Sequence, residues 1–60
     1  MYFVYVNKRK GRVLITRKRV LGGGWRLAAA YGNAAAAMRL ARFIADVRDY
    51  VLEWDLYVFE

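Results

Sequence analysis

The chain has 60 residues, of which 11 are basic and five acidic, and its formal net charge is +6 at pH 7. It contains no cysteine and no histidine, so disulfides, thiolate or imidazole metal sites and the common nucleophile–base pairs are excluded. At 60% hydrophobic residues the chain is too apolar for a disordered tail, and it is too short for two cores. We therefore expect a single domain over residues 1–60, with no cofactor and no enzymatic activity.

The longest uncharged stretch runs from Leu27 to Met38 and includes Gly32 and Asn33. A membrane-spanning helix needs about 20 consecutive apolar residues, so this stretch predicts no membrane segment. The first residues lack the basic region of a signal peptide. These features favour a cytoplasmic protein.

The charge is divided unevenly along the chain. Residues 1–30 carry eight basic side chains and no acid, whereas residues 31–60 carry three basic and five acidic ones. Such asymmetry indicates a polyanionic partner for the first half. The acidic second half is a candidate contact for neighbouring proteins.

The first 21 residues have the pattern of a β-hairpin. β-Branched and aromatic residues predict a strand from Tyr2 to Lys8, and the pattern resumes from Arg12 to Leu21. Between them Gly11 can adopt the positive φ of a tight turn. We predict a hairpin over 2–21, with the loop length and the buried face left open.

Three glycines, residues 22–24, interrupt this pattern and suggest a flexible connector. Alternation then predicts a third strand over 25–31, with one face formed by Trp25, Leu27, Ala29 and Tyr31. An alanine-rich helix starting at Leu27 is the alternative, because alanine has the highest helix propensity.

The second half predicts a helix over 34–50 with Asn33 as its N-cap. Its small residues allow close approach to a sheet, and helical spacing predicts a continuous apolar stripe of Ala37, Leu40, Ile44, Val47 and Val51. Alternation predicts a last strand over 53–60. The expected fold is α+β: a two-layer sandwich in which one helix covers a small, antiparallel-rich sheet of order β-β-β-α-β.

The basic clusters are the main functional signal. Like charges on one hairpin repel each other, and phosphates would remove that repulsion and release counterions. Arginine, the commoner cation here, pairs with phosphate bidentately. Trp25 is the one aromatic residue that a loop could present for base stacking. The candidate nucleic-acid-binding residues are Lys8, Arg9, Lys10, Arg12, Arg17, Lys18, Arg19, Trp25 and Arg26.

Other side chains have simpler interpretations. The acids Asp46 and Asp49 are expected to neutralise arginines on a solvated helix face rather than to perform acid–base chemistry or hold Mg²⁺. The remaining aromatic residues, Phe3 and Tyr5 among them, are expected mainly to fill the core of a small domain. No phosphate-binding glycine motif is present.

In size, charge and layout, the chain resembles small accessory ribosomal proteins of thermophilic archaea. It shares with them short length, an arginine- and alanine-rich composition without cysteine, and a charged hairpin on a small body. The resemblance implies a structural, non-enzymatic role on ribosomal RNA. Two alternatives remain open: a chromatin or viral protein that binds double-stranded DNA, and a protein-interaction module that dimerises through a strand edge.

Overall fold

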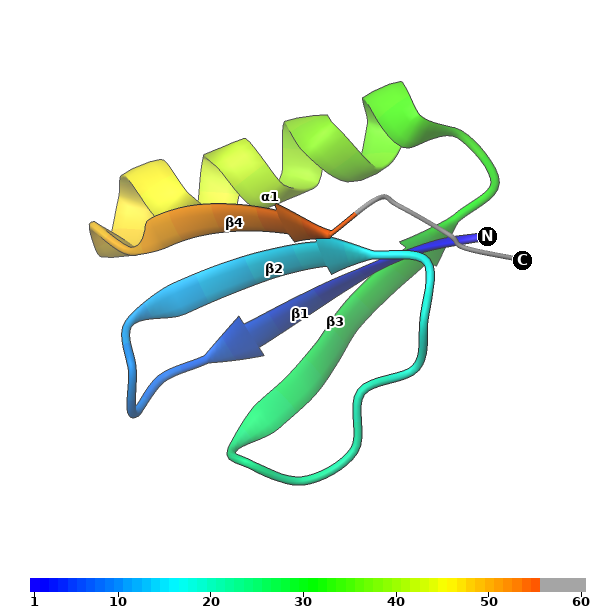
Figure 1. Ribbon diagram of the computed structural model, residues 1–60. Coiled ribbons are helices and arrows are strands. Elements are labelled where there is room, and N and C mark those ends of the chain that lie inside the picture. The colour runs from blue at the N-terminus through cyan, green and yellow to red at the C-terminus, as the bar shows by residue number, and fades with distance from the viewer. Residues whose placement is uncertain (56–60) are drawn as a thin grey trace.

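The computed structural model describes residues 1–55, in which one helix packs on a four-stranded sheet (Figure 1). The elements are β1 (Tyr2–Asn7), β2 (Arg12–Thr16), β3 (Trp25–Tyr31), α1 (Ala34–Arg48) and β4 (Val51–Asp55). The α+β prediction and its β-β-β-α-β order are confirmed. The part of the predicted last strand that covers residues 56–60 lies outside the described residues.

The sheet has the order β3-β1-β2-β4, so the two strands of the hairpin lie in its interior. β1 pairs antiparallel with both β2 and β3, whereas β4 pairs parallel with β2. The sheet is therefore mixed but antiparallel-rich. β3 and β4 form its two edges.

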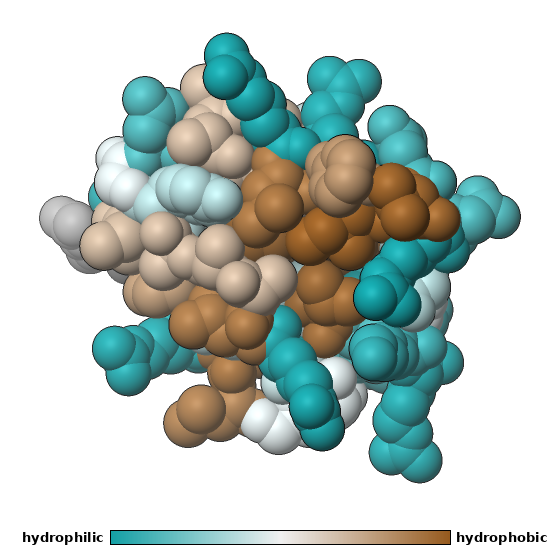
Figure 2. Space-filling model, turned by 180° about the vertical axis from the view of Figure 1, so that it is seen from behind, coloured by the Kyte–Doolittle hydropathy of each residue, from teal (hydrophilic) through white to brown (hydrophobic). Residues whose placement is uncertain are grey.

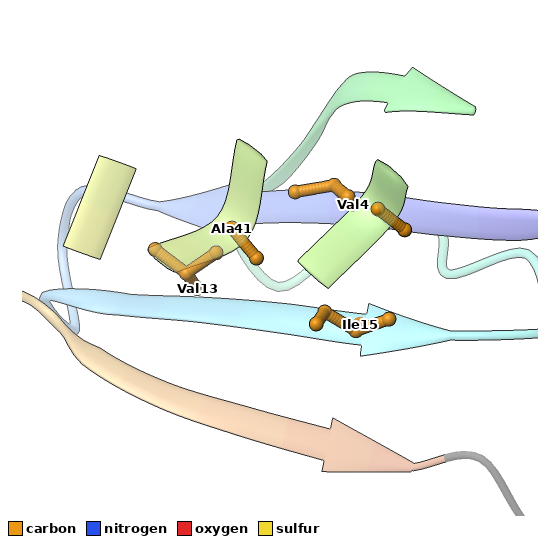
Figure 3. Packing of buried hydrophobic residues seen from close by; sticks show 5 residues of the cluster. Val4, Val13, Ile15 and Ala41 are labelled. Atoms are coloured by element: carbon orange, nitrogen blue, oxygen red, sulfur yellow. The ribbon is translucent and has the colours of Figure 1, made fainter. Parts of the chain in front are cut away.

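The core lies between α1 and one face of the hairpin. Val4, Val13 and Ile15 are buried against Ala37 and Ala41 of the helix, and Figure 3 shows these side chains gathered between the two layers. Val4 lies opposite Ile15, so the register places both on the helix side of the sheet. The small alanine side chains let the helix approach the strands closely.

The helix begins as predicted, and its N-cap is confirmed. The Oδ1 atom of Asn33 accepts hydrogen bonds from the backbone amides of Ala35, at 2.7 Å, and Ala36, at 3.4 Å. The helix ends at Arg48 rather than at residue 50, because Asp49 adopts a left-handed conformation with φ of 57°. The chain then turns directly into β4, two residues before the predicted start.

Because the helix ends early, the last two residues of the predicted apolar stripe do not lie on its buried side. Val51 belongs to β4 and not to the helix, and Val47 is exposed, as is Phe43 beside it. The predicted positions Ala37, Leu40 and Ile44 do pack against the core, and the fully buried residues of α1 are Ala37 and Ala41. From behind, the molecule shows a hydrophobic area bordered by hydrophilic side chains (Figure 2). The helix is thus apolar over a wider arc than the sheet covers.

The third strand exists, but its predicted single face is wrong. A register shift opposite Val4 and Tyr5 inserts Ala28 as an extra residue, so that Ala29 lies opposite Val4 and Leu27 opposite Tyr5. Such a bulge reverses the direction of the side chains that follow it. Ala29 therefore lies on the helix side, whereas Leu27 lies on the opposite face of the sheet, here called the outer face.

Candidate nucleic-acid interface

The tip of the hairpin is a four-residue turn, residues 8–11, between the paired residues Asn7 and Arg12. Asn7 is fully buried, and its Oδ1 atom accepts a hydrogen bond of 3.0 Å from the backbone amide of Lys10. Gly11 has φ of 64° and accepts at its carbonyl from the Val51 amide. The turn is thus attached to β4, and it holds the exposed cations of residues 8–10 at one end of the sheet.

Arg12 differs from the other predicted cations because it has an acidic partner. Its guanidinium forms an ion pair with the Glu53 carboxylate on the neighbouring strand β4. Both side chains are well exposed, so the pair contributes at most about 1 kcal/mol to the free energy of unfolding. It is the only ion pair within residues 1–55, and it makes Arg12 the least available cation of the predicted set.

The second basic cluster opens the connection from β2 to β3, which comprises residues 17–24. Arg17 places its guanidinium carbon 5.3 Å from the centre of the Tyr2 ring, which is cation–π distance. The amide of Lys18 donates to the Thr16 hydroxyl at 3.1 Å. This cluster therefore starts at the end of β2 opposite the hairpin turn. The predicted extension of the second strand to Leu21 is wrong, because the chain leaves the sheet after Thr16 and residues 17–24 form the connection.

From there the connection returns along the outer face to the start of β3. It runs on the other side of the sheet from α1 (Figure 1). The Tyr5 hydroxyl accepts from the Val20 amide at 3.0 Å, and Asn7 Nδ2 donates to the Gly23 carbonyl at 2.8 Å. Both anchoring side chains come from β1, which the connection crosses.

The backbone conformation of this connection explains why it contains three glycines. Gly22, Gly23 and Gly24 have φ values of 76°, 66° and 83°, a region that other residues rarely adopt. A Cβ atom on Gly24 would also lie 3.3 Å from Asn7 Oδ1. The triplet thus follows a defined path against β1, in contrast to the flexible connector suggested by its composition.

Two hollows flank the start of β3. The basic hollow has a volume of about 320 Å³ and is lined by Val6, Lys8, Arg9, Gly24 and Arg26. The aromatic hollow, on the outer face, has a similar volume of about 320 Å³, and Arg19 and Trp25 are among its lining residues. Among the described residues 1–55, none that lines either hollow is acidic.

The nine predicted residues are therefore distributed rather than gathered in one site. Lys8, Arg9 and Arg26 share the basic hollow, although Arg26 is distant from the other two in sequence. Arg19 and Trp25 share the aromatic hollow. Lys10 is exposed in the turn, Arg17 and Lys18 lie at the far end of β2, and Arg12 is paired.

Sequence reasoning did not assign Phe3, Tyr5, Leu21 and Leu27 to any site, yet all four line the aromatic hollow. Phe3 and Tyr5 alternate with the core residue Val4 on β1, which was a usable signal for the opposite face. Their ring centroids are 6.2 Å apart and tilted by 42°. Leu27 was predicted on the same face as Ala29, and the bulge between them places it on the outer face instead.

Comparison with models of known protein families, with curated proteins and with solved structures found no significant match. No helix within residues 1–55 is long and apolar enough to cross a membrane.

Proposed function

We propose that this protein is a non-enzymatic RNA-binding protein that contacts phosphates through the basic hollow. The observation that carries the proposal is the convergence of Lys8, Arg9 and Arg26 around one concave surface, whose lining includes no acid from the described part of the chain. The hairpin turn supplies Lys8 and Arg9, β3 supplies Arg26, and Gly24 of the glycine connection also lines the hollow.

Electrostatics supports an anionic ligand there. Three cations around one hollow repel each other in the free protein, and an intramolecular acid would be the simplest way to relieve that repulsion. Glu53 provides such an acid to Arg12, whereas the described residues place none in the lining of the hollow. A bound phosphate would relieve the repulsion and release counterions, which is favourable at moderate salt.

The arrangement of the cations favours folded RNA over double-stranded DNA. A β-ribbon that enters a major groove must be slender, but both hairpin strands here are flanked by other strands and α1 covers one face. The cations occupy both ends of β2 and both faces of the sheet. Separate contact points of this kind suit an irregular array of phosphates, such as that of ribosomal RNA.

The test is the salt dependence of RNA binding. If about five phosphates are neutralised, the plot of log K against log salt concentration has a slope near −4. We expect the double variant Lys8→Gln/Arg26→Gln to make that slope shallower by about 1 to 2. The matched control, Arg39→Gln/Arg42→Gln, removes the same charge from the exposed side of α1 and should leave the slope nearly unchanged.

Two results would overturn the proposal. A wild-type slope shallower than about −1 would mean that the cations do not contact phosphate. An equal decrease of the salt slope in the two double variants would mean that net charge, and not the basic hollow, determines RNA binding.

The class of partner is decided by parallel measurements. Co-sedimentation with ribosomes and a raised A260/A280 ratio on purification are expected for a ribosomal RNA ligand. Tighter binding to duplex DNA at equal salt would support the DNA alternative. A stable dimer without bound nucleic acid would support association through a strand edge, for which β3 and β4 are the two free edges of the described sheet.

A further inference from the structure

The aromatic hollow on the outer face is distinct from the basic hollow in chemistry as well as in position. Its lining includes three aromatic side chains and one cation. Its volume of about 320 Å³ is at the lower end of the range of ~300–1,000 Å³ for small-molecule sites. The lining residues that matter here are Phe3, Tyr5, Arg19, Leu21, Trp25 and Leu27.

Large apolar side chains are exposed to solvent at this hollow. Leu21 is 93% exposed and Leu27 is 53% exposed, although both are large hydrophobic residues. The bulge at Ala28 turns Leu27 and Trp25 away from the helix-covered face, where they would otherwise add to the core. Bulges commonly re-aim side chains beside functional sites, and clustered exposed apolar groups mark binding surfaces.

The combination of groups specifies the ligand. Aromatic rings offer flat apolar faces for stacking, and the guanidinium of Arg19 can pair with phosphate or stack on a ring. A nucleobase has a flat apolar face and is linked to an anionic backbone. In a duplex the base faces are covered by neighbouring pairs, so only an unpaired base can enter the hollow.

The two hollows lie beside neighbouring residues of the edge strand β3. Trp25 and Arg26 are adjacent in a strand and therefore point to opposite faces, so that Trp25 lines the aromatic hollow and Arg26 the basic one. Because β3 is an edge of the described sheet, no strand within residues 1–55 lies between the two hollows on that side. One nucleic-acid strand can therefore pass around this edge with a phosphate on one side and a base on the other.

We propose that the aromatic hollow binds a single unpaired base of the RNA, stacked on Trp25, with Arg19 at the adjoining phosphate. This inference rests on the proposed RNA binding and adds to it a preference for single-stranded over duplex segments. Phe3, Tyr5, Leu21 and Leu27 supply further apolar lining of the hollow.

Fluorescence of Trp25 tests the proposal in the Trp54→Phe background, which leaves Trp25 as the only tryptophan. The probes are a single-stranded oligouridylate of about ten nucleotides, within the usual site size, and a blunt RNA duplex of the same length. We expect the single strand to quench Trp25 emission and the duplex to bind without quenching. Uridine monophosphate is added as a third probe and should quench only at much higher concentration.

Two variants locate the site. Trp25→Leu keeps an apolar side chain in place and should weaken single-strand binding roughly 5- to 100-fold, with less than about a twofold effect on the duplex. Leu21→Asp adds a negative charge to the lining of the hollow, so it should weaken single-strand binding. Because the Leu21 side chain is 93% exposed, this substitution should not affect folding. The matched control is Phe43→Leu, which alters an aromatic residue on α1 that is 64% exposed.

The outcomes separate this inference from the proposed function. If both RNAs bind equally and Trp25 emission does not change, the base site is wrong while RNA binding stands. If neither RNA binds, both proposals fail. If uridine monophosphate binds as tightly as the oligonucleotide, the ligand is a free nucleotide and the inference is overturned. Should Trp25→Leu fail to fold, an unchanged single-strand affinity in Leu21→Asp alone would contradict the site.

Discussion

Two connections join strands that run in the same direction, and they cross opposite faces of the sheet. Residues 17–24 lead from β2 to β3 across the outer face, and α1 leads from β3 to β4 across the other face. The helix is held by burial, with Ala37 and Ala41 fully covered. The loop is held by hydrogen bonds to three side chains: the hydroxyls of Thr16 and Tyr5 accept from loop amides, and Asn7 donates to a loop carbonyl. Each of these side chains is at most 5% exposed.

The difference explains why one face is sealed and the other is open. Apolar burial is proportional to area, so the helix lies as close to the strands as its side chains allow. Hydrogen bonds fix a loop at a few points and leave the space between them unfilled. The aromatic hollow occupies that space, and it supplies the exposed apolar surface that a ligand can cover.

The largest expected effect concerns the helix-covered face. Ile15→Ala removes a side chain that is 1% exposed and leaves a cavity under α1, so it should lower the free energy of unfolding by about 2–5 kcal/mol. Urea denaturation followed by circular dichroism measures this loss. Leu21→Ala in the loop is the control and should cost less than about 0.5 kcal/mol. Similar losses at the two positions would mean that the faces are not stabilised differently.

A smaller effect is expected where the loop is anchored. Asn7→Ala leaves the Gly23 carbonyl and the Lys10 amide without their partner, and should lower the free energy of unfolding by about 1–3 kcal/mol. Hydrogen exchange should show loss of protection at the Trp25 amide, which bonds to the Gly22 carbonyl, before any loss in α1. If the helix and the loop lose protection together, the loop is not held independently of the core.

The N-cap of α1 is the one place where the helix depends on a polar side chain as the loop does. Asn33→Ala removes the acceptor for the Ala35 and Ala36 amides and should cost about 1 kcal/mol. Asn33→Asp keeps the acceptor and should retain most of the stability. Thermal melting of both variants checks this, and an equal loss in both would show that the side-chain acceptor is not responsible.

The smallest effect is expected at the ion pair between β2 and β4. A double-mutant cycle with Arg12→Gln and Glu53→Gln should give a coupling energy below about 1 kcal/mol, because both side chains are solvated. Glu53→Gln should also strengthen RNA binding slightly, since it releases Arg12. A coupling well above that value, or weaker RNA binding in Glu53→Gln, would contradict this view of Arg12.

Local rules were enough to predict much of the architecture. β-Branched and aromatic residues indicated the first two strands, and alternation indicated the last two. Asn33 located the start of the helix, and its small residues indicated close helix–sheet contact, because each signal depends on residues near one another in the chain. The end of the helix was missed because Asp49 adopts a left-handed conformation in place of the usual glycine. The outward side of Val47 was missed because a helical pattern does not show how wide a sheet lies beneath it.

By itself, the sequence determined the classes of element, their order and the concentration of positive charge in the first 30 residues. The tertiary structure alone decided which of those charges meet. Arg26 joins Lys8 and Arg9 because β3 adds to the free side of β1, and Arg12 is neutralised because β4 adds beside β2. Likewise, a one-residue bulge sends Trp25 and Leu27 to the outer face. Strand order and register result from contacts between distant segments, and no local pattern encodes them.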